Sequence, residues 1–141
     1  MESDQQDQGI SWKSLAARAE GNLHFPGSTL VEEDHRDEGE GWGFDNVTMD
    51  AMLLRHWTVD AEPDEVMDWF SRKLVARGWT PGGGAPFKPG LGGHSFFARE
   101  TSHFTLRVIG RAETRPWWTF WRRSWNDGGL HYDVTLSASE S

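Results

Sequence analysis

The stretches VTMDAMLLRHWTV (residues 47–59) and PDEVMDWFSRKLVAR (residues 63–77) decide the fold of this chain. In the first, alternate positions place apolar side chains on one face of an extended strand, namely Met49, Ala51, Leu53, Trp57 and Val59. Arg55 is the one charge on that face, and we interpret it as a side chain that reaches solvent from a strand end. Met52 and Leu54 make the second face partly apolar, which is typical of a central strand.

The second stretch predicts an amphipathic helix over residues 63–77. Pro63 suits the first helical position, and Asp64 adds negative charge to the first turn, where the helix dipole favours it. Gly78 suits the position just beyond the helix end. The expected inner stripe consists of Val66, Met67, Phe70 and Leu74. We expect Phe70 and Leu74 to be buried against a sheet.

Outward from this unit, alternation of apolar and polar residues predicts four more strands, over 28–35, 94–99, 103–109 and 130–137. A short helix is expected over 10–20, and residues 1–9 are expected to be a disordered tail. Pro81–Gly93 is so rich in glycine and proline that we expect an irregular connection, dispensable for folding. The elements predict one α+β domain over residues 10–141. It has two layers: a mainly antiparallel sheet of about four to six strands, with the 63–77 helix packed on one face and a short N-terminal helix.

Charge and cysteine content exclude several classes of function. The chain has 141 residues, no cysteine and a net charge of −8. The lack of cysteine excludes disulfides, thiolate nucleophiles and zinc–sulfur sites. The acidic total argues against nucleic-acid partners, while membrane association stays open. Residues 1–70 hold 17 Asp and Glu against 4 Lys and Arg, and residues 71–141 hold 5 against 10. Either the two halves of the chain face each other within one fold, or acidic and basic faces lie apart and suit a charged partner or self-association.

Several short motifs resemble a known group of proteins. The segments LAARAE (15–20) and HFPGSTL (24–30), with the Pro63-Asp-Glu-Val66 helix that ends in Arg77-Gly-Trp79, resemble small uncharacterised actinobacterial α+β domain proteins. The resemblance spans about residues 14–138; it supports the fold and implies no known activity. It also implies an extracytoplasmic or membrane-anchored structural domain. The sequence as written has no signal peptide or apolar span, so it predicts a cytoplasmic protein, or an extracytoplasmic one if the chain has been trimmed.

The search for chemistry gives little. No Ser lies in a Gly-x-Ser-x-Gly elbow, and none of the six His belongs to a His-Glu-x-x-His motif, so we predict no catalytic residue, no metal site and no cofactor. His103 and His131 open the outer faces of two strands and are expected to be exposed. Residues 32–40 are expected to form a solvated acidic loop, with a hard cation such as calcium as the alternative. The acidic and histidine side chains in that loop are Glu32, Glu33, Asp34, His35, Asp37, Glu38 and Glu40.

One aromatic segment exceeds what a small core needs, and it is the candidate binding surface. It consists of Trp117, Trp118, Phe120, Trp121, Arg122, Arg123 and Trp125, and Arg115 precedes it. If the segment is a helix, its four Trp share one face and could cover an open face of the sheet as part of the core. If the segment is instead exposed, it resembles an interface hot spot, because Trp and Arg are enriched in such sites.

Three hypotheses of function follow, and they lean away from an enzyme. The leading one is a non-catalytic domain that binds a protein partner or a second copy of itself through residues 115–125. The second is a small-ligand-binding protein or an enzyme, with a pocket beneath residues 81–93 or 115–125. A convergent set of polar groups, such as Arg55 with the neighbours of His56, would favour it. The third is the anchored structural domain that the resemblance implies.

Overall fold

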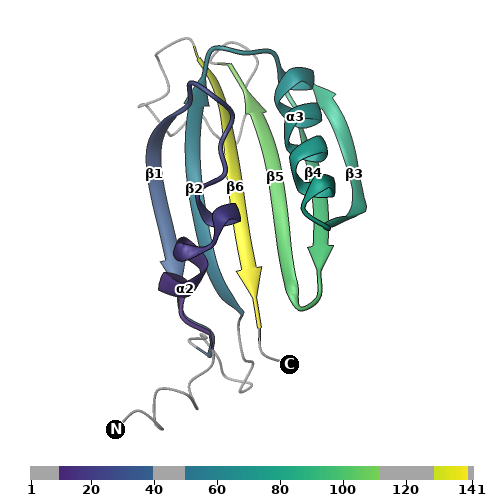
Figure 1. The fold of residues 1–141 in the computed structure, drawn as a ribbon. Coiled ribbons are helices and arrows are strands. Elements are labelled where there is room, and N and C mark those ends of the chain that lie inside the picture. Colours follow the sequence, from purple (N-terminus) through teal and green to yellow (C-terminus); the bar gives the residue numbers. More distant parts are fainter. Residues whose placement is uncertain (1–9, 40–49, 112–128, 140–141) are drawn as a thin grey trace, which may run out of the picture.

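The structure is a computed structural model, and it describes residues 10–39, 50–111 and 129–139. Six strands form one antiparallel sheet in the order β1-β2-β6-β5-β4-β3. They are β1 (Thr29–Arg36), β2 (Ala51–Val59), β3 (Thr80–Lys88), β4 (Gly92–Arg99), β5 (Ser102–Gly110) and β6 (Leu130–Ala138). Helix α2 (Trp12–Ala17), the 3₁₀ turn η1 (Ala19–Asn22) and helix α3 (Pro63–Ala76) all lie on one face of this sheet (Figure 1). We call it the helix face. The opposite face, which no described helix covers, is called the open face. The predicted α+β fold is confirmed.

Strand β6, from the C-terminal end of the chain, lies in the middle of the sheet between β2 and β5. It pairs with both neighbours, so its main chain is hydrogen-bonded on two sides. Its alternation explains this position. One set of side chains is buried in the core under the helices, namely Leu130, Tyr132, Val134, Leu136 and Ala138. The other set faces the open side, and part of it forms the site described below.

Helix α3 follows the pattern predicted for it. Pro63 occupies the first turn, and Glu62 and Glu65 form a capping box that satisfies main-chain N–H groups at the helix start. Val66, Phe70 and Leu74 are buried, which confirms the predicted inner stripe, although Met67 is only partly buried. Gly78 follows the helix at φ 90°, a left-handed conformation that glycine adopts without strain.

The predicted helix over residues 10–20 is interrupted. Ser11 caps α2, which ends at Ala17, and Arg18 adopts an extended conformation before η1 begins. Tertiary contacts explain the break: the Arg18 guanidinium donates to the Ser102 hydroxyl at the start of β5, and the Glu20 carboxylate is buried beside Trp79.

The prediction that Pro81–Gly93 is irregular is wrong. Most of the segment is strand β3, an edge strand that pairs with β4 and contains two bulges, after Pro81 and after Ala85. Proline is tolerated because an edge strand needs main-chain hydrogen bonds on one side only. Gly84 is required by space as well as by its φ of 142°, since a Cβ there would lie 2.2 Å from the His94 carbonyl oxygen.

The remaining differences lie at element ends. Strand β2 begins at Ala51, and the expected disordered tail (1–9) and the first residues of the 47–59 strand lie outside the described residues. In the described part of the chain, no helix has the length and apolar character needed to cross a membrane.

Candidate functional site

A row of four polar side chains crosses the middle of the open face. His56 on β2 is directly opposite Asp133 on β6, and Asp133 is directly opposite Arg107 on β5. His131 lies two residues before Asp133 on the same strand and therefore on the same face. Strand register thus brings together residues that are 26 to 77 positions apart in sequence. We call this set the open-face polar chain.

Direct hydrogen bonds join its members end to end. Asp133 Oδ2 accepts from Arg107 Nη2 at 2.5 Å, and Asp133 Oδ1 accepts from His56 Nδ1 at 2.5 Å. The other ring nitrogen of His56, Nε2, lies 2.8 Å from His131 Nδ1. Both oxygens of the carboxylate and both nitrogens of the His56 ring are therefore engaged within the chain.

Three of the four side chains in the open-face polar chain are buried, and this affects the charge state of Asp133. The two His are each 1% exposed, Asp133 is buried, and Arg107 is about half exposed. Burial alone raises the pKa of the Asp133 carboxyl, but the hydrogen bonds and charges of His56 and Arg107 outweigh it and hold the pKa below its ordinary value. Asp133 is thus an ionised acceptor at neutral pH, and the His56 ring must carry its proton on Nδ1.

The prediction that His131 is exposed is wrong, whereas His103 is exposed as predicted. His131 is on the open face, where the strand register places its ring against that of His56, and it is buried there. Sequence reasoning missed the set as a whole. The one signal in the sequence was that three strands each carry charged or histidine side chains on the face opposite their apolar residues. Only the strand order and the register show that these side chains are neighbours.

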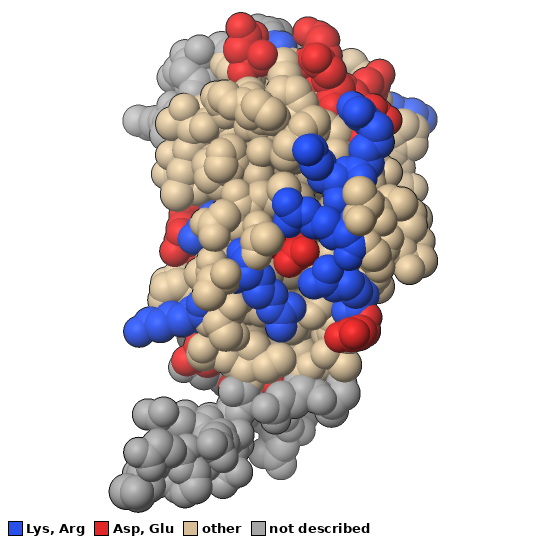
Figure 2. Space-filling model, in the orientation of Figure 1, with Lys and Arg blue, Asp and Glu red and all other residues tan. Residues whose placement is uncertain are grey.

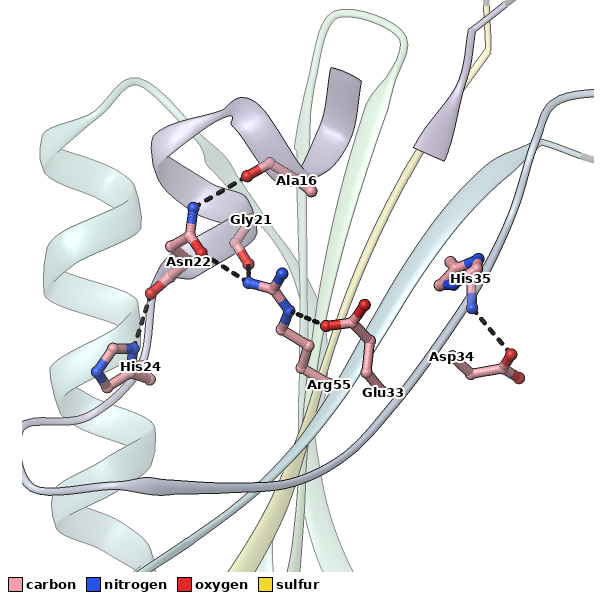
Figure 3. A network of polar contacts seen from close by, with 8 residues as sticks. All are labelled: Ala16, Gly21, Asn22, His24, Glu33, Asp34, His35 and Arg55. Atoms are coloured by element: carbon pink, nitrogen blue, oxygen red, sulfur yellow. Dashed lines mark hydrogen bonds and ion pairs between the residues drawn. The ribbon is translucent and has the colours of Figure 1, made fainter. Parts of the chain in front are cut away.

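Arg55 extends toward Gly21 and Asn22 on the helix face, and it does not simply reach solvent at a strand end (Figure 3). Since it comes directly before His56 in β2, the two side chains lie on opposite faces of the sheet. Its Nη1 donates to the Gly21 carbonyl and to Asn22 Oδ1, each at 2.7 Å, and its Nε donates to Glu33 Oε1 at 3.0 Å. Arg55 therefore fastens η1 and the edge strand β1 to β2. It belongs to a structural contact and does not join the polar groups near His56.

The acidic run at 32–40 forms strand and turn in its described part, rather than the predicted loop. Glu32, Glu33 and Asp34 lie in β1 and alternate between faces. Asp37 and Glu38 accept main-chain N–H groups of the N-terminal segment, at Trp12 and Ile10. No group of three or more His, Asp or Glu side chains suited to a metal ion occurs within residues 10–39, 50–111 and 129–139.

A second group of charges gathers on the helix face around the buried carboxylate of Glu20. Glu20 Oε2 lies 3.4 Å from Arg99 Nη1 and 3.8 Å from Arg77 Nη1. Arg99 also lies over the Trp79 ring, with the guanidinium carbon 4.7 Å from the ring centroid. Arg18 precedes Glu20 by two residues and donates to the Ser102 hydroxyl. Lys73 lies in the last turn of α3, four residues before Arg77, with its Nζ 5.6 Å from the centroid of the Trp69 ring. We call Arg18, Lys73, Arg77 and Arg99 the basic patch.

The largest groups of acidic and of basic side chains lie at different places on the helix face, although single acidic side chains also lie among and below the basic ones (Figure 2). Blue side chains collect over the second half of α3 and the adjoining end of the sheet, and red ones collect where α3 begins. The acidic end consists of the exposed residues Asp60, Glu62, Asp64 and Glu65. Among the described residues, charge is thus separated along α3, with acidic side chains at its start and basic ones at its end.

Two cavities lie along the described part of the surface. One, of about 530 Å³, is lined by Glu32, Glu33, Asp34 and Leu54. The other, of about 350 Å³, is lined by Met67, residues 83–86, His94 and Ser95, at the segment where the sequence suggested a ligand pocket. The described linings of the two cavities include no member of the open-face polar chain. Most residues that line the second cavity are small.

The candidate binding surface of Trp117, Trp118, Phe120, Trp121, Arg122, Arg123 and Trp125 lies outside the described residues. Its position and state therefore stay predictions. Comparison with models of protein families, with curated proteins and with solved structures found no match to this chain.

Proposed function

We propose that this protein is a non-catalytic binding domain whose partner is a protein with an acidic surface. The basic patch carries the proposal: Arg77 and Arg99 meet at Glu20 on the helix face, and Lys73 lies one helical turn away over the Trp69 ring, in a chain whose net charge is −8. A local positive field on a negative molecule orients an approaching acidic partner and rejects other orientations. The separation of charge along α3 therefore favours a partner that binds to the helix face in one orientation.

The open-face polar chain supports binding over catalysis. It is the convergent set of polar groups that would favour an enzyme, but its two His and its carboxylate are buried and bonded to one another. A catalytic base has to come within hydrogen-bond distance of its substrate. In this structure Asp133 and His56 use those positions for each other.

The proposal includes the aromatic segment as a second contact surface. Trp and Arg dominate the energetics of many interfaces, and Trp117–Trp125 contains both. Charge steering by the basic patch and apolar anchoring by the Trp rings are complementary, because the first sets the rate of association and the second slows dissociation.

Binding of a fluorescently labelled poly-glutamate peptide tests the role of the basic patch. Lys73→Glu is expected to weaken binding, and salt is expected to weaken it in the wild-type protein because exposed charges are screened. Arg72→Glu is the matched control: it makes the same charge change on the adjacent exposed residue, which pairs with Asp68 instead. Equal losses in the two variants, or tighter binding of single-stranded DNA or anionic vesicles than of the peptide, would overturn the proposed partner.

A second experiment tests the aromatic segment. Trp118→Gln with Trp121→Gln is expected to preserve the far-ultraviolet circular dichroism spectrum and to abolish partner capture or self-association. Unfolding of this variant would assign the two rings to the core instead. Complete protection of Trp117, Trp118, Trp121 and Trp125 from a soluble fluorescence quencher, in a proven monomer, would contradict the binding surface.

A further inference from the structure

The contact between His56 and His131 limits how many protons the two rings can hold. His56 Nδ1 donates to the Asp133 carboxylate, which can only accept. Between His56 Nε2 and His131 Nδ1, 2.8 Å apart, one nitrogen must donate and the other must accept. If both rings were protonated, two N–H groups would point at each other. The geometry therefore admits a neutral pair or a pair with one added proton, and it excludes the doubly protonated pair.

We propose that the His56–His131 pair is a one-proton site that makes the fold acid-sensitive, because a second proton breaks the ring contact and loosens the centre of the sheet. The inference is independent of the proposed binding function. The pair joins β2 to β6, and β6 in turn joins the two halves of the sheet. Loss of the contact between the two rings therefore weakens the sheet at β6, the strand that connects its two halves.

The charges around the pair are consistent with this limit. In the described part of the chain, the charged groups that face the pair are Asp133, Arg107 across β6 and Glu32, which is opposite His56 on β1. The Arg107 guanidinium already offsets the Asp133 carboxylate. Arg111, just beyond β5, donates to the Ala61 carbonyl and approaches Glu62. The described helices α2 and α3 and the turn η1 contribute no charge to this face, because they lie on the other one.

The sign of the pH effect follows from counting protons. In the unfolded chain each ring takes up a proton as the pH falls through the range in which His titrates, so the two rings bind two. The folded pair binds at most one. The unfolded state therefore binds more protons in acid, and stability falls as the pH is lowered.

Urea unfolding across about pH 5 to 8, the range in which His titrates, tests the inference. His131→Asn retains an amide at the position of Nδ1 and removes the second titrating ring. On the acid side, the wild-type folding constant is expected to fall about tenfold more per pH unit than that of His131→Asn, a difference of one proton. His103→Asn, an exposed His on the same face, is the control and should follow the wild type. Parallel profiles for the wild type and His131→Asn would overturn the inference.

A measurement on the wild-type protein makes the test independent of the variant's ability to fold. Nitrogen NMR of the ring atoms reports which of the four nitrogens in the pair carries a proton. His56 Nδ1 should be protonated throughout, and the folded protein should show one added proton on the pair at most. A folded state in which both rings are doubly protonated would refute the one-proton site.

Discussion

Replacement of Phe70 by Ala is expected to be among the most destabilising changes in the helix layer. The side chain is 0% exposed and lies where α3 meets the sheet. Its ring packs edge-on against Tyr132 of β6 at 5.6 Å between centroids and lies 5.9 Å from the ring of Phe104 on β5. Loss of the transfer free energy and the cavity left behind cost about 3–5 kcal/mol together when a Phe is fully enclosed. Since the neighbours are themselves large and buried, we expect little collapse and a value in the upper half of that range.

Phe96→Ala is the matched control, because it is the same substitution at a ring that is 44% exposed on the open face. We expect it to cost about 1 kcal/mol, in proportion to the smaller apolar area removed from water. Urea denaturation followed by far-ultraviolet circular dichroism gives both free energies of unfolding, provided that the denaturant slopes agree. Similar costs for the two variants would refute the assignment of Phe70 to the centre of the core.

Two further predictions concern main-chain packing and alkaline pH. Gly84→Ala should destabilise the protein by on the order of 2–3 kcal/mol, because the new Cβ clashes at a backbone conformation that only glycine adopts without strain. Gly82→Ala is the control: its Cβ has room, so its thermal unfolding should stay close to that of the wild type. Equal melting temperatures for the two variants would show that β3 does not contribute to stability. Burial raises the pKa of Tyr132 to about 12, although hydrogen bonds with the Ser28 hydroxyl and the Phe25 amide lower it in part. Because Tyr132 is the only tyrosine, tyrosinate absorbance should stay silent near pH 10 in the folded protein, and the stabilisation it gives below its unfolded pKa should be lost as the pH rises towards 12. Ordinary titration near pH 10 with the fold intact would contradict its burial.

The parts of the fold that could be predicted are those in which local pattern and final environment agree. In β2 and α3 the apolar period matches the secondary structure, and one side of each element is buried in the core, so periodicity alone located Leu53, Phe70 and Leu74 correctly. The same holds for β6. Its alternation predicted a strand, although not that a C-terminal strand would occupy the centre of the sheet.

The parts that could not be predicted depend on long-range contacts. The glycines and prolines of residues 81–93 do not predict a strand from local sequence. They are tolerated in β3 because it is an edge strand, which needs main-chain hydrogen bonds on one side only, and because its glycines allow close approach to β4. For the open-face polar chain, the sequence placed His131 and Asp133 on opposite sides of Tyr132 in an alternating strand, hence on one face. It contained no information on register, which alone decides that His56 is the residue opposite Asp133.

The composition of the two edge strands determines how this sheet can meet other chains. An exposed edge normally offers unpaired N–H and C=O groups to which another extended chain can add, and native proteins block this with charge, proline or bulges. Strand β1 presents consecutive carboxylates at Glu32, Glu33 and Asp34, and β3 combines Pro81 and Pro86 with two bulges. Neither edge offers a continuous, neutral row of donors and acceptors. Strand addition and fibril growth from these two edges are therefore disfavoured. We expect a second copy or a partner to meet the described part of this molecule through a face of the sheet or a helix, and not by adding a strand at β1 or β3.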